Sequence, residues 1–291
     1  MSLDESYNKE RIMVGKYSFD VVENQRKYNG KLFMRTFKIG GDYQDCVNLS
    51  YTYNNGNPVS AKLPHLMYEP ECSIGSDHPR GLGSVVLIKS LLEYAHNKIK
   101  DVSKFEFDDM SNIDCVEKDL SLKPPRLLIK PLKLSYFSLA YHDKTWYEKN
   151  FNATMKDKQK YKKYRETITF LKDPNRKESF ETFLAIAKPP IEQINLLKSY
   201  YENANTYREF FNNIPFDNRC DILFPWLVGF MSYYLKDIII EYGWEIDINT
   251  MNNTNKINTK KGGNRKNKTI KENRLVPKKY KLINYTEMHS F

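Results

Sequence analysis

Residues 78–97 read HPRGLGSVVLIKSLLEYAHN, and this stretch organises the chain around it. From Ser84 onward the apolar side chains recur three or four residues apart, which is the spacing of one face of an α-helix. The stripe consists of Val85, Ile88, Leu91 or Leu92, Ala95 and Ile99. Further apolar residues lie between these positions, so most of the helix circumference is apolar. The pattern predicts a helix from Ser84 to about Asn97 that is buried against a sheet.

A glycine-containing turn precedes this predicted helix. Gly81 and Gly83 have no Cβ, so an anion can approach the backbone N–H groups closely at these positions. The first N–H groups of a helix have no partners inside the helix, and the helix dipole adds partial positive charge at the same end. His78 and Arg80 can supply further donors at the rim. The turn is therefore a candidate anion site, and the alternative is an ordinary connection between a strand and a helix.

The segments on both sides of the helix have the pattern of β-strands. Before it, between Tyr17 and Glu71, the predicted strands are residues 31–38, 46–53 and 61–68. The Asn55-Gly56 pair between the last two strands indicates a hairpin, and the Asn-Pro pair that follows favours a loop longer than two residues. After the helix, residues 104–108 and 134–141 are predicted to be strands. These patterns predict an α+β fold with a mixed, mostly antiparallel sheet flanked by helices.

Beyond Phe151 the sequence changes to Lys- and Tyr-rich segments of helical character with Pro-containing breaks. These predicted helical segments are residues 154–172, 177–187, 189–211 and 221–242. Their apolar stripe of Phe180, Phe183, Leu184 and Ala187 is typical of a packed core. We therefore predict three parts: a mixed domain at 1–152, a C-terminal helical extension at 153–250, and a basic tail at 251–291.

The net charge of +10 is located in the tail. Residues 255–281 contain eleven basic side chains and one acid, Glu272, which leaves 35 basic and 35 acidic groups in the rest of the chain. Residues 252–281 are also poor in apolar side chains, so we expect a disordered segment. Such a tail attracts nucleic acid or an acidic protein surface through its charge. A solubilising role or a localisation signal is the alternative.

Targeting signals and cysteine spacing give no indication of secretion. The first 16 residues are polar, and the longest apolar run, 222–235, is interrupted by Pro225 and is shorter than the roughly 20 residues that a spanning helix needs. The four cysteines are scattered and suggest neither a zinc site nor a disulfide framework. The expectation is a cytoplasmic protein in a reducing compartment, without a metal site and without a membrane partner.

The turn and the helix after it resemble those of the GNAT N-acetyltransferase superfamily. In that family a Gln/Arg-x-x-Gly-x-Gly/Ala turn follows a central strand and begins a long helix, and Gly81 and Gly83 match its two small positions. His78 stands where the family has Gln or Arg. The resemblance implies a GNAT-like fold over roughly residues 30–152 and acetyl-CoA as the acyl-donor co-substrate. The residues it implies in acyl-CoA binding are Met67, His78, Arg80, Gly81, Leu82, Gly83 and Ser84.

A second segment, Thr145-Trp146-Tyr147-Glu148-Lys149-Asn150-Phe151, is similar to the family's "aromatic, Tyr, Glu, Lys, any, Gly, Phe" motif. The resemblance implies that Tyr147 protonates the departing CoA thiolate as a general acid. The alternative for Tyr147 is a core aromatic pair with Trp146. A base for the attacking amine is expected among the strand-end carboxylates Glu69, Glu106 and Asp108, of which Glu69 lies nearest the turn.

The resulting functional hypothesis is an acyl-CoA-dependent N-acyltransferase that transfers an acetyl group to an amine by direct attack. The acceptor is a small molecule or a protein amine. The alternative is a non-catalytic, GNAT-like virion or interaction protein whose tail binds nucleic acid or an acidic partner. The virion role is suggested by the composition of the chain and by its tail. Both resemble uncharacterised proteins of large nucleocytoplasmic DNA viruses. Host cytoplasm or the virion is the location that this resemblance implies.

Overall fold

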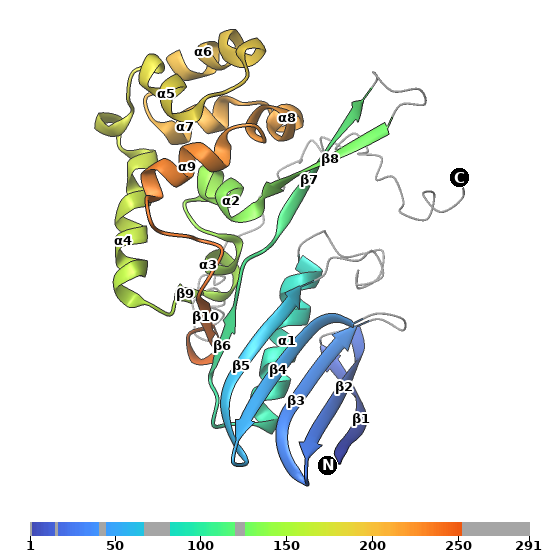
Figure 1. Cartoon of the computed structure of the whole chain (residues 1–291). Coiled ribbons are helices and arrows are strands. Elements are labelled where there is room, and N and C mark those ends of the chain that lie inside the picture. The colour runs from blue at the N-terminus through green and yellow to red at the C-terminus, as the bar shows by residue number, and fades with distance from the viewer. Residues whose placement is uncertain (1, 15–16, 41–44, 67–81, 120–125, 252–291) are drawn as a thin grey trace, which may run out of the picture. The chain divides into compact units, whose positions relative to one another are not determined.

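The computed structural model describes residues 2–14, 17–40, 45–66, 82–119 and 126–251 (Figure 1). Within them, an eight-stranded sheet has the strand order β1-β2-β3-β4-β5-β6-β10-β9, and β7 pairs with β8 in a separate hairpin. The strands of the large sheet are β1 (Leu3–Val14), β2 (Tyr17–Tyr28), β3 (Lys31–Gly40), β4 (Asp45–Asn54), β5 (Asn57–Leu66), β6 (Lys104–Phe107), β9 (Thr154–Met155) and β10 (Trp244–Asp247). The hairpin consists of β7 (Asn112–Asp119) and β8 (Arg126–Lys133).

The pairing is antiparallel throughout the large sheet except between β5 and β6, which are parallel. The predicted α+β class with a mostly antiparallel sheet is therefore confirmed. The sheet extends further at its amino-terminal end than predicted, because neither β1 nor β2 was among the predicted strands. β1 alternates polar and charged residues whose side chains are largely exposed, so it lacks the apolar alternation that marks a half-buried strand.

The hairpin between β4 and β5 has a two-residue turn. Asn55 and Gly56 occupy it with φ of 50° and 83°, a left-handed conformation that Asn and Gly adopt readily. The predicted longer loop is therefore wrong. The Asn57-Pro58 pair is accommodated instead by a shift of register between Thr52 and Tyr53, where a β-bulge lets β5 carry a proline near its start.

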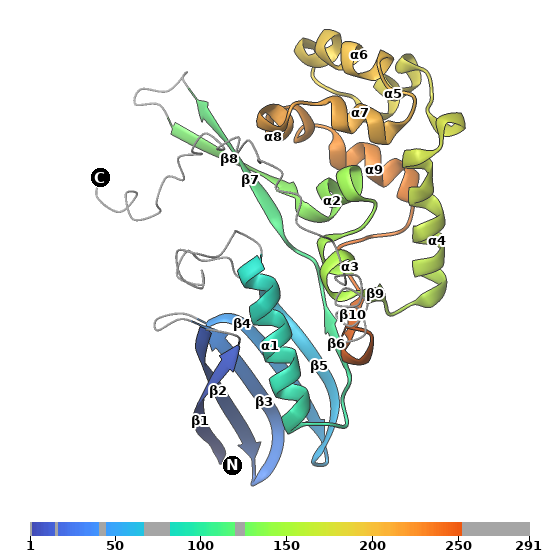
Figure 2. The ribbon, with the colours of Figure 1, turned by 180° about the vertical axis from the view of Figure 1, so that it is seen from behind.

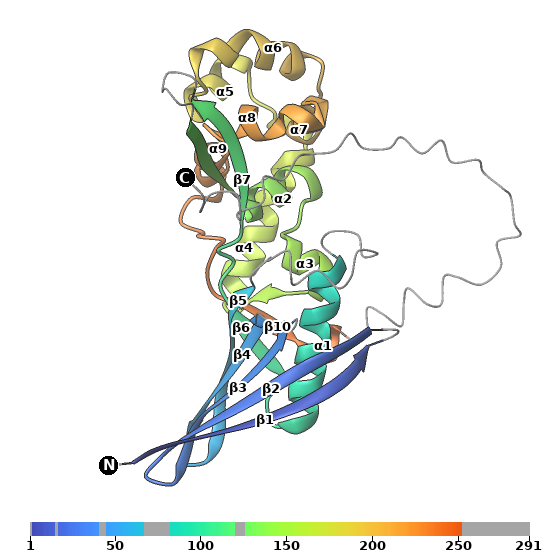
Figure 3. The ribbon, with the colours of Figure 1, turned by 90° about the vertical axis from the view of Figure 1, so that its right-hand side faces the viewer.

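The helix predicted after the glycine turn is confirmed as α1 (Leu82–Lys98). It packs on β3 and β4, on one face of the sheet (Figures 2 and 3). Five of its side chains are almost completely buried there: Leu87, Ile88, Leu91, Leu92 and Ala95. α1 connects β5 to β6, which are parallel neighbours in the sheet. The three elements therefore form a crossover unit, in which the carboxyl ends of β5 and β6 lie at the same edge of the sheet.

Residues 134–141 form a helix, α2 (Leu134–His142), so the predicted strand there is wrong. Six residues of α2 are buried, including Ser135 and Ser138, and an apolar run without polar alternation does not distinguish a buried helix from a buried strand. Asp143 ends α2 in a left-handed conformation with φ of 60°.

Most of the chain between residues 146 and 235 is helical, as predicted. The α-helices are α3 (Trp146–Phe151), α4 (Lys158–Ile168), α5 (Phe180–Ala187), α6 (Ile194–Glu202), α7 (Tyr207–Asn213), α8 (Arg219–Leu223) and α9 (Leu227–Leu235). Short 3-10 turns connect them at Thr169–Lys172, Pro174–Arg176, Ile191–Gln193 and Phe216–Asn218. Phe180, Phe183 and Ala187 are buried and Leu184 packs on the same core, which confirms that this stripe is core.

The helical region is inserted into the sheet and does not follow it. β9 precedes the helices, and β10 returns after them to pair with both β6 and β9. Lys158, at the start of α4, forms an ion pair with Glu245 of β10 at 2.6 Å. The described residues belong to one compact unit, and the expected boundary at 152 falls next to β9, a strand of the common sheet. The basic segment 252–281 lies outside the described residues.

A disulfide joins Cys115 of β7 to Cys220 of α8, so the prediction of no disulfide is wrong. The two cysteines are 105 residues apart in the sequence and are brought together by the packing of the hairpin against α8. Their spacing alone contains no signal of this. The expectation of a reducing compartment loses its basis here. Within the described residues, no helix combines the length and the apolar character needed to cross a membrane.

Replacing Cys115 or Cys220 by Ala is expected to lower the free energy of unfolding by about 2–4 kcal/mol, because the disulfide restricts the unfolded chain over a long loop. Urea unfolding of the two variants and the parent protein measures this difference. A non-reducing peptide map checks that the two cysteines are linked, and unchanged stability in both variants would contradict a structural role for the bond.

Candidate functional site

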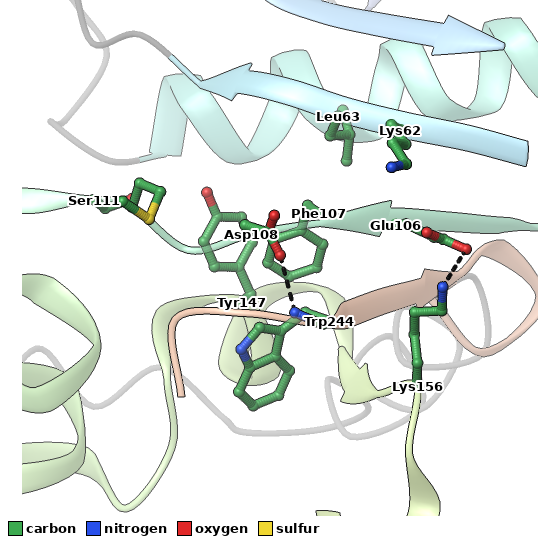
Figure 4. A pocket seen from close by; sticks show the side chains of 11 residues that line it. Lys62, Leu63, Glu106, Phe107, Asp108, Ser111, Tyr147, Lys156 and Trp244 are labelled. Atoms are coloured by element: carbon green, nitrogen blue, oxygen red, sulfur yellow. Dashed lines mark hydrogen bonds and ion pairs between the residues drawn. The ribbon is translucent and has the colours of Figure 1, made fainter. Parts of the chain in front are cut away.

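β5 and β6 separate after two paired positions, and a cavity lies where they part. The pairs are Lys62 with Glu106 and Leu63 with Phe107, and β5 then continues to Leu66. The cavity has a volume of about 550 Å³. It is lined by Lys62, Leu63, Glu106, Phe107, Asp108, Met110, Ser111, Tyr147, Lys156, Gly243 and Trp244 (Figure 4).

The strands part because the backbone after β6 has its hydrogen-bond partners elsewhere. Asp109 N donates to the carbonyl oxygen of Glu241 at 2.6 Å. The carboxylate of Asp108 accepts a hydrogen bond from Gly243 N at 2.9 Å. Both partners lie just before β10, so the chain after β6 is held toward β10 and diverges from β5. The end of β5, Pro64 to Leu66, then keeps backbone groups that β6 does not use, although Pro64 itself has no N–H.

Tyr147 of α3 lies in the wall of this cavity. Its side chain is only 3% exposed, and its ring packs on Phe107 with the centroids 4.3 Å apart. Trp146 contacts the same ring edge-on at 4.9 Å. The hydroxyl of Tyr147 points into the space between β5 and β6 (Figure 4). The two predicted roles of Tyr147, a core aromatic partner of Trp146 and a general acid, are therefore compatible. The ring packs in the core while the hydroxyl reaches the cavity.

Burial raises the pKa of Tyr147 above its ordinary value, and the negative charge of Asp109 raises it further. A hydrogen bond with the Ser111 side chain opposes this shift. The phenol therefore remains protonated throughout the neutral pH range. In this state it can donate a proton and cannot accept one as a base.

Glu148 fixes the helix that carries Tyr147. Its carboxylate accepts a hydrogen bond from Thr145 N at 2.8 Å, while Glu148 N donates to Thr145 Oγ1 at 3.2 Å, which is a capping box. The same carboxylate also accepts hydrogen bonds from three side chains of α4: Tyr161 at 3.0 Å, Tyr164 at 2.7 Å and Arg165 at 3.4 Å. Because Glu148 joins α3 to α4 in this way, it determines where the Tyr147 ring lies.

Asp109 is a buried carboxyl that the sequence prediction missed. It is 1% exposed, and its Oδ1 accepts a hydrogen bond from Ser111 N at 3.2 Å. Burial raises its pKa to about 6, against hydrogen bonds from Ser111 that lower it. A signal for this residue exists in the sequence, because Phe105 and Phe107 alternate inward along β6 and residue 109 is the next position of the series.

The carboxylates predicted as candidate bases have different surroundings. Glu106 lies on the cavity wall and forms an ion pair with Lys156 at 2.7 Å. Asp108 lies on the same wall and is exposed. Glu69 lies outside the described residues.

The predicted acyl-CoA turn is described only at its end. Leu82, Gly83 and Ser84 form the first turn of α1, so the helix begins two residues before the predicted start at Ser84. Met67, His78, Arg80 and Gly81 lie outside the described residues. The helix begins after the same strand, β5, that forms one wall of the cavity.

No protein-family model, curated protein or solved structure matches the chain. In the described ranges, no group of three or more His, Cys, Asp or Glu side chains is arranged to hold a metal ion.

Replacing Glu148 by Ala is expected to lower the free energy of unfolding by about 3 kcal/mol, because it removes a buried acceptor from four donors. Urea unfolding measures the change. Glu166→Ala is the matched control on α4: Glu166 is exposed, its pair with Lys162 is 3.9 Å long, and the expected change is below about 0.5 kcal/mol. Equal effects of the two substitutions would contradict the anchoring role of Glu148.

Replacing Asp109 by Asn is expected to change the pH dependence of stability. The folded-state pKa of about 6 lies above the ordinary value of 3.8, so the contribution of Asp109 is favourable below pH 3.8 and is lost as the pH rises through about 6. The Asn variant should therefore gain about 2 kcal/mol relative to the parent between pH 4 and pH 7. Urea unfolding at pH 4, 5, 6 and 7 tests this, and a difference independent of pH would refute the buried, shifted carboxyl.

Proposed function

We propose that the protein is an acyl-CoA-dependent N-acyltransferase of GNAT type that transfers an acetyl group from acetyl-CoA directly to an amine. The observation that carries the proposal is the place of the Tyr147 hydroxyl. It lies in a cavity between two parallel strands that part, and one of these strands, β5, precedes the helix α1, which begins at Leu82. Tyr147 belongs to one of the two segments that resemble GNAT motifs, and Gly83, in the first turn of α1, belongs to the other.

The gap between β5 and β6 suits an extended amide-containing arm. β5 continues past its last pair with β6, Leu63, through Pro64 to Leu66. Pro64 has no N–H, so this stretch offers an extended chain its carbonyl groups and no more N–H donors than those of His65 and Leu66. The pantetheine arm of an acyl-CoA contains two amides in such a chain. The first N–H groups of α1, which begins at Leu82, have no acceptors inside the helix and suit a pyrophosphate.

The reaction requires a neutral amine, a positioned thioester and a proton for the leaving thiolate. The amine nitrogen attacks the thioester carbonyl carbon, a C–N bond forms, and the C–S bond breaks with its electron pair going to sulfur. Tyr147 donates its phenolic proton to that sulfur, since the phenol is protonated and reaches the cavity. The proton released by the nitrogen passes to water or to a carboxylate of the wall, for which Glu106 and Asp108 are available.

The mixed charge at the cavity wall is compatible with an amine acceptor. Lys62 and Lys156 bring positive charge there, and Glu106 and Asp108 bring negative charge. The acceptor class, a small amine or a protein amine, stays open. A non-catalytic interaction protein of the same fold is the second candidate, and it predicts binding of acyl-CoA without turnover.

Replacing Tyr147 by Phe is expected to lower the rate of thiol release from acetyl-CoA by about 10²-fold or more, because general acid catalysis typically contributes 10²–10⁴-fold. The measurement is thiol release with a panel of amines and peptide amines, together with calorimetric binding of acetyl-CoA, which should not change. Tyr141→Phe is the matched control: Tyr141 is a buried tyrosine of α2 that does not line the cavity, and its hydroxyl has no hydrogen-bond partner among the described residues.

Three results separate the candidates. No binding of acetyl-CoA at millimolar concentration would refute both the acyltransferase and the acyl-CoA-binding protein. Binding without thiol release in the parent protein would favour the non-catalytic candidate. Turnover that is equally fast in the Tyr147 and Tyr141 variants would retain the acyltransferase and exclude Tyr147 as its acid.

A further inference from the structure

The two faces of the large sheet have different surroundings. α1 packs on one face at β3 and β4, where Phe37 and Leu49 are completely buried and Phe37 contacts Tyr94 of the helix. Among the described elements, no helix lies on the opposite face of β1 to β5 (Figures 1 and 3). We call this second surface the open face.

The strand register identifies the side chains of the open face. Residues that pair between neighbouring strands direct their side chains to the same face, and this face alternates along each strand with the one under α1. Three rows of side chains therefore cross the open face. The rows are Lys9-Val22-Lys38-Asn48, Tyr7-Asn24-Thr36-Ser50-Lys62-Glu106 and Glu5-Arg26-Met34-Thr52-Ser60.

Polar side chains predominate in these rows. Val22 and Met34 are the only apolar residues in them, and the only aromatic residue is Tyr7 on the edge strand β1. Six residues have a hydroxyl or amide group: Asn24, Thr36, Asn48, Ser50, Thr52 and Ser60. The centre of a specific protein interface is enriched in aromatic residues and depleted of charge. The open face therefore does not have the composition of a protein-binding surface.

Positive charge predominates on the open face and at its margins. Arg11 pairs with Asp20 in the next row, while Lys104, Lys156 and Lys158 join the face through ion pairs with Glu106 and Glu245. Together there are eight basic and four acidic side chains: Lys9, Arg11, Arg26, Lys38, Lys62, Lys104, Lys156 and Lys158 against Glu5, Asp20, Glu106 and Glu245.

The acidic side chains of this set lie deeper than the basic ones. Each acid has a basic partner at 2.6 to 2.7 Å. The basic side chains in these ion pairs are 44% to 68% exposed, whereas the acids are 11% to 31% exposed. The charge that an approaching molecule meets first is therefore positive.

We propose that the open face binds the phosphate backbone of a nucleic-acid duplex. Lys and Arg, together with Ser, Thr and Asn, are the side chains that contact phosphate oxygens. Interfaces with nucleic acid are also more polar and more positively charged than those between proteins. Binding of a single strand relies on aromatic side chains that stack on its bases, and the rows contain none from β2 to β6. The chemistry therefore favours a duplex, bound without regard to its base sequence.

The extent of the face suits such a partner. Neighbouring strands lie about 4.8 Å apart, so the six strands from β1 to β6 extend over about 24 Å. A duplex carries one negative charge per about 1.7 Å of its axis, or about 14 over that length. The inference does not depend on the acyltransferase. Because Lys62, Glu106 and Lys156 also line the cavity, the test replaces other residues.

The salt dependence of binding tests the open face. Fluorescence anisotropy measures the Kd of DNA and RNA duplexes between about 50 and 200 mM salt for the full-length parent and for the triple variant Lys9→Gln, Arg11→Gln, Lys38→Gln. We expect the Kd to rise about 10-fold or more at the lower salt concentration, and the slope of log Kd against log salt to fall by up to about 3, since each lost phosphate contact lowers it by about 1.

The matched control is the triple variant Lys162→Gln, Lys163→Gln, Lys198→Gln, which removes the same charge from exposed positions of α4 and α6. It should change the slope by less than about 1. Urea unfolding checks that both triple variants are folded. Equal effects of the two triple variants would overturn the open face as the binding surface. Tighter binding of single strands or of polyglutamate than of either duplex would overturn the choice of partner.

A mapping experiment on the parent protein separates the open face from the basic segment 255–281, which can attract the same duplex. A lysine-acylating reagent is applied with and without duplex, and modified sites are read by mass spectrometry. Lys9, Lys38 and Lys104 should lose reactivity when the duplex is bound, whereas Lys162 and Lys198 should keep it. Protection confined to residues 255–281 would overturn the proposal, whatever the affinity.

Discussion

The buried carboxylate of Glu148 is the interaction on which the arrangement of the cavity depends. It completes the cap of α3 and at the same time accepts hydrogen bonds from α4, so two helices are fixed by one side chain. Tyr147 precedes it by one residue and faces the cavity. The position of the candidate acid is therefore determined by the hydrogen-bond requirement of its neighbour, because a buried carboxylate needs its donors in place.

A second constraint comes from the order in which the strands are joined. β6 pairs with β5 on one side and with β10 on the other, and the latter pairing extends over four residues, from Lys104 to Phe107. After Phe107 the backbone hydrogen bonds go to the segment before β10. The separation of β5 from β6, and with it the cavity, follows from this competition for the backbone of one strand.

Local signals in the sequence predicted much of the fold and part of the candidate site. The helix after Gly83, the strands around it and the inclusion of Tyr147 in a cavity wall follow from periodicity, turn residues and a short motif. Three features did not follow, because they depend on contacts between distant segments. α2 has no alternation to identify it, the Cys115–Cys220 bond spans 105 residues, and the pairing of β10 with β6 is invisible in either strand alone. Asp109 was predictable in part: the alternation along β6 directs its side chain inward, whereas its hydrogen bond with Ser111 N is known only from the structure.

The insertion of the helices between β9 and β10 also has a consequence for biosynthesis. Gly243 and Trp244 form part of the cavity wall, and the ribosome adds them roughly a hundred residues after Tyr147. During translation, β5, α1 and β6 emerge early and have to wait for their last neighbour while the helical region is made. Contacts that span so much sequence slow folding. A chain terminated anywhere in the helices would contain both motif-like segments and still have an incomplete pocket.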